Sequence, residues 1–203
     1  MSIHMKAVEE GETINILIVG VGGQGALLIS KILGKAALAA GKKVTISEIH
    51  GMAQRGGAVE TLVRIGKDES PISDDVHILV SLEPAEVLRN LFRITVDTAV
   101  ITSINTIVPF TVSIGQADYP DIEKAIPALE EKFHNLVALD TNDLAEKAGN
   151  AIASNVVLLG CLTAVKGFPF SYEYIQETVR KMVPPKTIEV NMEALRLGRE
   201  AGL

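Results

Sequence analysis

A short apolar run followed at once by a glycine-rich loop constrains the fold of this chain more than any other feature. Residues Ile14–Val19 are almost continuously apolar, as in a strand that is covered on both faces. Gly20–Gly25 follows with the pattern G-x-G-x-x-G, and Ala26–Ala40 has the leucine and alanine spacing of a packed helix, with Gly41 where a C-terminal cap belongs. A strand, a tight loop and a helix in this order predict a layered α/β fold.

The rest of the chain repeats the alternation of strands and helices. Apolar or alternating segments predict five further strands, at residues 43–49, 58–65, 76–82, 99–102 and 136–140. Helical patterns fall at residues 84–91, 121–132, 142–148, 154–165, 171–182 and 187–201. The strand at 58–65 begins too soon after the preceding strand for a helical crossover, so part of the sheet should be antiparallel. We therefore expect a single domain with a Rossmann-like, mostly parallel but mixed sheet, three α/β/α layers and a helical C-terminal part.

Composition excludes several classes of protein. The chain has 203 residues, of which 47% are hydrophobic and 22% charged, which suits one globular domain. Its longest apolar run, residues 156–165, is about half the ~20 residues of a membrane span, and no secretory signal is evident. A net charge of −6 with scattered Lys and Arg argues against a nucleic-acid surface. We expect a cytoplasmic protein with a flexible N-terminal segment at residues 1–13 and a domain at 14–203.

The chain is poor in groups that carry redox or metal chemistry. Cys161 is its single cysteine, whereas an iron–sulfur cluster normally takes about four thiolates. The thiol lies in an apolar helical segment and is expected to belong to the core. No nucleophile–base pair stands at recognisable spacing, and His77 and His134 lie in strand-like contexts. We therefore expect this chain alone to bind no metal or redox cofactor.

The first glycine loop matches the dinucleotide-binding fingerprint in the context that the fingerprint requires. Its candidate contact residues are Gly20, Gly22, Gly23, Gln24 and Gly25. Glu48 ends the second predicted strand, about where a dinucleotide-binding fold places its ribose carboxylate. The residues leave three interpretations open: a bound nicotinamide or flavin dinucleotide, a different phosphate-bearing ligand or protein partner, and a turn that serves packing only.

A second loop, Glu48–Gly57, is the densest polar segment of the chain. It reads E-I-H-G-M-A-Q-R-G-G, and its candidate contact residues are Glu48, His50, Gln54 and Arg55. In the expected sheet it lies beside the first loop at the carboxyl edge, where open α/β sheets bind ligands. The structural alternative is that Glu48 pairs with Arg55 while His50 and Gln54 bond to their own loop.

Polar residues after later strands reach the same edge. Asn105 and Thr106 follow the fifth strand and are further ligand-contact candidates, with ordinary turn chemistry as the alternative. Asp140, at the end of the sixth strand, is expected to cap the next helix, and capping is also the default role of Asn155.

The two loops in this order closely resemble the gamma-type domain of 2-oxoacid:ferredoxin oxidoreductases, and within that superfamily the small (beta) subunit of indolepyruvate ferredoxin oxidoreductase. Supporting matches are L-E-P-A-E at 82–86, Y-P-D at 119–121, L-A-E-K-A-G-N at 144–150, N-V-V-L-L-G at 155–160, and residues 186–191. The similarity runs from about Ile14 to the C-terminus. The polar first 13 residues, Phe110 and Thr111 depart from the family pattern, outside both loops.

The resemblance implies a subunit of a multi-subunit enzyme. Such an enzyme oxidatively decarboxylates an aryl 2-oxoacid with coenzyme A as co-substrate, giving an aryl-acetyl-CoA, carbon dioxide and reduced ferredoxin. Thiamine diphosphate, Mg and iron–sulfur clusters are expected on a large (alpha) partner subunit, with ferredoxin reached through the complex, and the isolated chain is expected to be inactive. Two alternatives remain: a free-standing NAD(P)-dependent oxidoreductase built on Gly20–Gly25, and a non-catalytic domain that docks a partner.

Overall fold

A six-stranded mixed sheet organises the chain in the order β2-β3-β1-β4-β5-β6. The computed structural model describes residues 3–8, 12–50, 57–66, 76–108, 112, 114–115 and 118–203, with the side chain of His50 excepted. The strands are β1 (Ile14–Val21), β2 (Val44–His50), β3 (Ala58–Ile65), β4 (Ile78–Ser81), β5 (Ala99–Ser103) and β6 (Leu136–Leu139). β1, β4, β5 and β6 pair in parallel, whereas β3 is antiparallel to both β1 and β2. The predicted mixed, mostly parallel sheet is confirmed.

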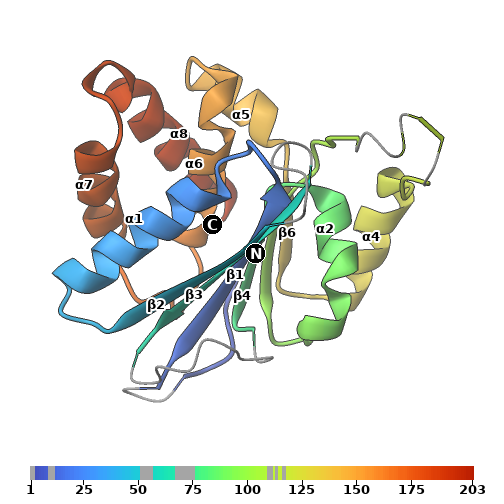
Figure 1. Cartoon of the computed structure of the whole chain (residues 1–203), viewed down its shortest axis with the longest axis horizontal. Helices are drawn as coiled ribbons and strands as arrows, with labels where there is room; N and C mark the ends of the chain where they lie inside the picture. The colour runs from blue at the N-terminus through green and yellow to red at the C-terminus, as the bar shows by residue number, and fades with distance from the viewer. Residues whose placement is uncertain are drawn as a thin grey trace.

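Helices cover both faces of this sheet. They are α1 (Ala26–Ala39), α2 (Pro84–Arg89), α4 (Ile122–Lys132), α5 (Thr141–Lys147), α6 (Ser154–Leu162), α7 (Tyr172–Met182) and α8 (Ile188–Ala201), with 3-10 turns η1 (Leu91–Arg93), η2 (Ala151–Ala153) and η3 (Pro185–Thr187). α1, α6, α7 and α8 lie on one side of the sheet and α2 and α4 on the other (Figure 1). This is the three-layer α/β/α arrangement that the sequence predicts.

The two faces of the sheet bury separate cores because successive side chains of a strand point in opposite directions. Ile16 and Ile18 of β1 belong to the core under α1 and α6, whereas Leu17 and Val19 belong to the core under α2 and α4. Every residue of β1 after Ile14 is buried. The near-continuous apolar run is therefore explained by a strand that packs on both faces.

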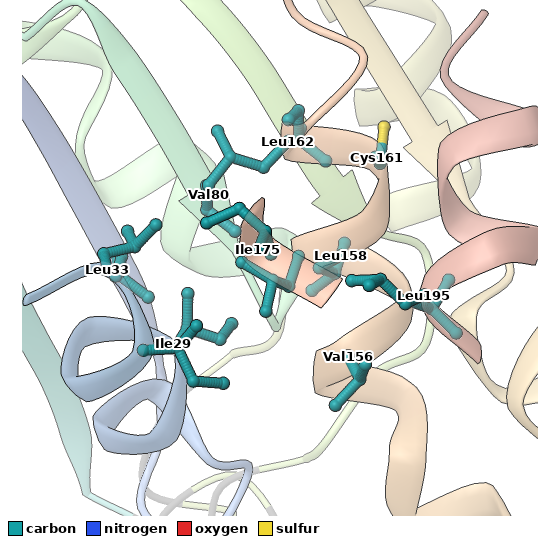
Figure 2. Close-up of a cluster of buried hydrophobic side chains, with 14 of the residues drawn as sticks. Ile29, Leu33, Val80, Val156, Leu158, Cys161, Leu162, Ile175 and Leu195 are labelled. Carbon is teal, nitrogen blue, oxygen red and sulfur yellow. The ribbon is translucent and has the colours of Figure 1, made fainter. Parts of the chain in front are cut away.

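α6 lies at the centre of the larger core. All of its residues except Ser154 are buried, and Leu158 and Leu162 belong to the same buried cluster as Ile29 of α1, Val80 of β4 and Ile175 of α7 (Figure 2). Because α6 is apolar on all sides, it packs against the sheet and against α8 together.

Capping geometry marks several helix ends, and the caps predicted at Gly41 and Asp140 are confirmed. Gly41 follows α1 with φ 68°, and its N–H donates to the Leu38 carbonyl over 3.0 Å. The Ser171 hydroxyl accepts from the N–H of Tyr174 and caps α7, and Asp140 caps α5 by accepting from Asp143. Asn155 differs from its expected capping role, because α6 begins at Ser154 and its N-cap is Ala153.

The described part of the N-terminal segment differs from the expected flexible terminus. Ile3 and Met5 are buried while His4 and Lys6 are exposed, so residues 3–6 alternate like a strand. The Lys166 N–H donates to the Ile3 carbonyl over 2.9 Å, and the Met5 N–H donates to the Lys166 carbonyl over 3.2 Å. Two buried apolar side chains and these backbone bonds attach residues 3–6 to the loop after α6.

Candidate functional site

A cleft of about 270 Å³ opens at the carboxyl edge of the sheet, beside β1 and β4. From β1 the chain winds toward β2 and β3, whereas β4, β5 and β6 lie on the other side of β1. The crevice at such a reversal of winding is where open α/β sheets bind ligands. The cleft is lined by Gly23, Gln24, Leu82, Ser103, Asn105, Thr106, Ile107, Thr141, Asn142, Ile152, Ser154, Asn155 and Leu158. It therefore brings together the first glycine loop and the predicted candidates after β5.

Gln24 fastens the glycine loop to the sheet. Its Oε1 accepts from the Val21 N–H over 2.7 Å, and its Nε2 donates to the Leu82 carbonyl over 2.8 Å. A Cβ on Gly20 would lie 2.8 Å from this Oε1, so the side chain occupies the space that the glycine leaves free. In this structure Gln24 is thus a brace between the ends of β1 and β4.

The backbone amides of the loop are partly used within the protein. The Gly22 N–H donates to the Gly57 carbonyl over 2.9 Å, and the Gln24 N–H donates to the Val21 carbonyl over 3.1 Å. These two amides are therefore already bonded within the protein. The Gly22–Gly57 bond also places the end of the second polar loop beside the first.

Gly25 turns the chain into α1 with φ 91°, a conformation that favours glycine. The Asn155 side chain lies against it, since a Cβ on Gly25 would come within 2.1 Å of Asn155 Nδ2. Gly23, with φ 105°, would have no atom within 4 Å of an added Cβ. The loop is thus closely packed at Gly25 and open at Gly23.

The position of Glu48 does not match the ribose site of a dinucleotide-binding fold. In that fold the second strand of the chain lies directly beside the first strand in the sheet, whereas here β3 lies between β1 and β2. Glu48 pairs with Thr61, which pairs with Ile18, three residues before the end of β1. Two strand spacings amount to about 10 Å, so the carboxylate is displaced both sideways and backwards from the glycine loop. This geometry disfavours the nicotinamide interpretation.

The other candidates of the second loop are only partly described. Glu48 is exposed on β2, and the backbone of His50 ends that strand at the carboxyl edge. Gln54 and Arg55 lie outside the described residues. Their proposed contacts remain predictions from the sequence.

Asn105 joins β5 to the start of α5. Its Oδ1 accepts from the Thr141 hydroxyl over 2.9 Å and from the Asn142 N–H over 3.0 Å, and its Nδ2 donates to Asp140 Oδ1 over 2.9 Å. Ser103 Oγ lies 2.8 Å from the Thr141 hydroxyl. The N–H of Asp143, and then the amide of Asn105, hold the pKa of Asp140 below its ordinary value. Asn105 therefore braces the cleft wall, in agreement with its turn-chemistry alternative.

A buried acidic cluster at the end of β4 is a feature that the sequence reasoning missed. Glu83 is 1% exposed and Glu86 5% exposed, and the Tyr119 hydroxyl donates to Glu83 Oε1. Burial raises the pKa of Glu86, although Arg89, 2.7 Å away, opposes the shift. Burial and the bond to Glu83 raise the pKa of Tyr119. The matched segments 82–86 and 119–121 meet in this cluster, and their co-occurrence in the family pattern was the available signal.

A larger cavity, of about 640 Å³, lies at the opposite edge of the sheet. Met5, Lys6, Lys42 and Gly66 are among the residues that line it. It adjoins the beginning of β1 and the end of β3, away from the carboxyl ends of the parallel strands. The smaller cleft therefore remains the better candidate site, because its position rather than its volume is typical of ligand binding in this architecture.

Cys161 belongs to the core, as predicted. It is fully buried in α6, and burial raises the pKa of its thiol to about 12. Among the described residues, no three His, Cys, Asp or Glu side chains are grouped as metal ligands would be. Within the same part of the chain, no helix has the length and apolar character that crossing a bilayer requires.

The fold and the cleft define the class of this protein: an open, Rossmann-like α/β domain with a polar carboxyl edge and an inserted antiparallel strand. The chain belongs to the pyruvate ferredoxin/flavodoxin oxidoreductase family, whose model matches residues 15–201. The resemblance carried by the two loops is thereby confirmed.

Known proteins similar to this chain agree with that family. The indolepyruvate oxidoreductase subunit IorB of Pyrococcus horikoshii is 44% identical over 92% of this chain and 95% of its own length. The subunit of the same name from Archaeoglobus fulgidus is 40% identical over 91% of this chain and 93% of its length. The crystal structure of a keto/oxoacid ferredoxin oxidoreductase gamma subunit from Geobacter sulfurreducens superposes with a TM-score of 0.70 at 22% identity, covering 94% of this chain and 97% of that one. This last likeness shows that the fold is shared.

Proposed function

We propose that this chain is the small subunit of an indolepyruvate:ferredoxin oxidoreductase. The observation that carries the proposal is 40% and 44% identity to two proteins named indolepyruvate oxidoreductase subunit IorB, over more than nine-tenths of each chain. The reaction would convert an aryl 2-oxoacid, coenzyme A and oxidised ferredoxin into an aryl-acetyl-CoA, carbon dioxide and reduced ferredoxin. Cytoplasmic location is part of this proposal.

In this proposal the redox groups belong to a large partner subunit. The described residues do not fit an iron–sulfur cluster, because the single thiol of the chain is buried in α6 and remains protonated at neutral pH. Thiamine diphosphate with Mg is likewise assigned to the partner. The contribution of this chain is then to shape the neighbourhood of the site through the loops at the carboxyl edge.

The small subunit would contribute the entrance for coenzyme A. The glycine loop precedes α1, whose positive N-terminal end favours anions, and it lies beside the cleft at the carboxyl edge. The phosphates of coenzyme A are our favoured partners for this loop. Arg55 of the second loop is the cation that we assign to a phosphate, to the substrate carboxylate or to an acidic group of the large subunit.

Two competing functions are less well supported. A free-standing NAD(P)-dependent oxidoreductase would need a ribose-binding carboxylate beside the glycine loop, and β3 separates Glu48 from that position. A domain that only docks a partner would leave the edge cleft without a ligand.

Co-expression with the large subunit from the same genome tests the proposal. The purified complex should reduce a viologen dye only when both indolepyruvate and coenzyme A are present, and neither chain should do so alone. Titration with NADH should leave the spectrum of the small chain unchanged. Failure of the pair to associate, or sustained turnover by this chain without a partner, would contradict the proposed function.

A further inference from the structure

The edge cleft contains a buried side-chain amide without a hydrogen-bond partner among the described residues. Asn155 is 7% exposed, lines the cleft and lies against Gly25 at the start of α1. Its amide makes no hydrogen bond to any described residue, in contrast to the neighbouring Gln24, whose amide is bonded at both ends. Neither amide atom of Asn155 is among the fully buried polar atoms that lack a partner, so the amide reaches the cleft and can bond to a molecule that enters there.

The other polar groups deep in the cleft are already engaged. Asn105 uses both ends of its amide, and the hydroxyls of Ser103 and Thr141 bond to each other or to Asn105. Asn155 is thus the deeply buried polar side chain of the described cleft that remains available to a visiting molecule.

The backbone beside Asn155 favours a negative charge. α1 is a helix of 14 residues that begins at Ala26, with no side-chain cap and no acidic residue in its first turn. The partial positive charge of its N-terminus therefore lies next in the chain to Gly23 and Gln24, which line the cleft. No charged side chain is among the cleft-lining residues, so no nearby carboxylate within that set repels an anion.

We propose that the Asn155 amide and the N-terminus of α1 together bind one oxyanion group of a small molecule. The amide Nδ2 donates from α6, and the first amides of α1 supply the positive end of the helix dipole. A volume of about 270 Å³ accommodates a phosphate or carboxylate with the adjoining part of its molecule. Only the choice of natural ligand, a coenzyme A phosphate or a 2-oxoacid carboxylate, rests on the proposed function.

NMR titration of the full chain tests the site directly. Sodium phosphate, added at constant ionic strength, should cause saturable shifts of the Gly23 and Gly25 amides and of the Asn155 side-chain NH₂. Absence of saturable shifts at these groups in the unaltered protein overturns the proposal, whatever the variants do.

Variants then separate binding from folding. Asn155→Asp keeps the shape but replaces a donor by a carboxylate. It should weaken phosphate binding at least about tenfold, because a charge-assisted hydrogen bond is lost and a repelling charge takes its place. Asn135→Asp is the matched control: Asn135 is 6% exposed and lies before β6, at the opposite edge of the sheet. Equal phosphate affinity of Asn155→Asp and the unaltered chain, with native-like spectra for both, would refute the role of Asn155.

Separate titrations with coenzyme A and with indolepyruvate identify the source of the oxyanion. Shifts of Gly23 and Asn155 with coenzyme A alone assign a phosphate, and shifts with indolepyruvate alone assign the carboxylate. Either result supports the site. These titrations use the small chain without its partner, so their outcome does not depend on the viologen assay. An inactive complex whose small chain still binds phosphate would contradict the proposed function and leave this inference standing.

Discussion

Single residues at the carboxyl edge have roles that their type alone does not reveal. Gln24 stands inside a dinucleotide-like fingerprint but uses its amide to join two strands, and Asn105 follows a strand end but holds α5 in place. Asn155 is the second residue of the buried helix α6 and does not cap it. A polar side chain whose hydrogen-bonding groups are already used within the protein acts as a brace, whereas one whose groups are not used can contact a ligand.

Replacing Gln24 should destabilise the chain. Gln24→Leu leaves the Val21 N–H and the Leu82 carbonyl without their partner, and each such loss costs about 1–3 kcal/mol when the group stays buried. We expect the free energy of unfolding, measured in urea, to fall by about 2 kcal/mol. Gln176→Leu, on the partly exposed surface of α7, is the control and should change stability by less than about 0.5 kcal/mol. Equal stability of the two variants would remove the brace role.

The Asp140 carboxylate should make stability depend on pH. Its pKa is lowered in the folded chain, so its stabilising effect is complete above the unfolded pKa of about 3.9 and is lost as pH falls through the folded pKa. Asp140→Ala should lower the free energy of unfolding by about 1 kcal/mol at pH 7, as loss of an N-cap does. Urea unfolding between pH 7 and pH 3 should show the difference from the parent chain shrinking toward the acid end. A difference that does not change with pH would contradict an ionised cap.

Arg55→Lys tests the second loop, which lies partly outside the described residues. A guanidinium holds a carboxylate or phosphate by two parallel bonds, and an ammonium does not reproduce that geometry. We expect the thermal midpoint of the isolated chain to stay nearly the same, because a surface ion pair contributes only about 0–1 kcal/mol. The reconstituted complex should show lower turnover or weaker saturation by coenzyme A. Lower stability together with lower activity would indicate that Arg55 braces the loop instead.

At the scale of elements, α6 and α8 approach each other so closely that only glycine fits at two positions of their contact. A Cβ on Gly198 would lie 1.9 Å from the Val157 carbonyl oxygen, and a Cβ on Gly160 would lie 2.1 Å from that of Leu195. Both obstacles are backbone atoms, so a methyl group forces the helices apart. The glycines therefore fix the distance at which α8 covers the buried α6, the centre of the core in Figure 2.

Gly198→Ala should consequently destabilise the chain, although alanine is the better helix former. Separating two packed helices costs about 1–3 kcal/mol, which exceeds the gain of about 1 kcal/mol in helix propensity. Gly34→Ala in α1 is the matched control, because its added methyl meets only the flexible end of Ile46, at 2.8 Å. The midpoint of thermal unfolding should be lower for Gly198→Ala than for the parent chain, and equal or higher for Gly34→Ala. The reverse order would show that helix propensity, not packing, limits stability.

At the scale of the whole molecule, the domain matches relatives of the same length and offers few groups of its own for redox chemistry. Its polar cleft, its acidic cluster and the start of its second loop all lie at the carboxyl edge of one sheet. Helices therefore cover both faces of the sheet, and these polar features gather at its carboxyl edge (Figure 1).

The purified small chain is expected to be colourless. A buried thiol with a pKa of about 12 does not ligate iron, and the sequence contains no second cysteine. Iron and acid-labile sulfide, measured after anaerobic purification, should be far below one per chain. Stoichiometric iron and sulfide on a monomer would require a ligand set that this sequence does not contain.

The sequence by itself determined the positions of the strands and helices, because these follow from local periodicity and capping chemistry. The apolar run of β1, the glycine after α1 and the serine before α7 each act within a few residues. The two signature loops likewise determined the family, since their residues are contiguous in the chain.

Tertiary structure alone decided which of those elements are neighbours. Insertion of β3 between β1 and β2 displaces Glu48 from the glycine loop, and no local pattern distinguishes this order from direct pairing of β1 with β2. The Leu82 carbonyl that Gln24 binds lies 58 residues away in the chain, and Thr141 and Tyr119, which bond to Asn105 and Glu83, each lie 36 residues away. Whether a polar side chain is a brace or an open contact depends on such distant partners, so the available amide of Asn155 became visible only once the chain was folded.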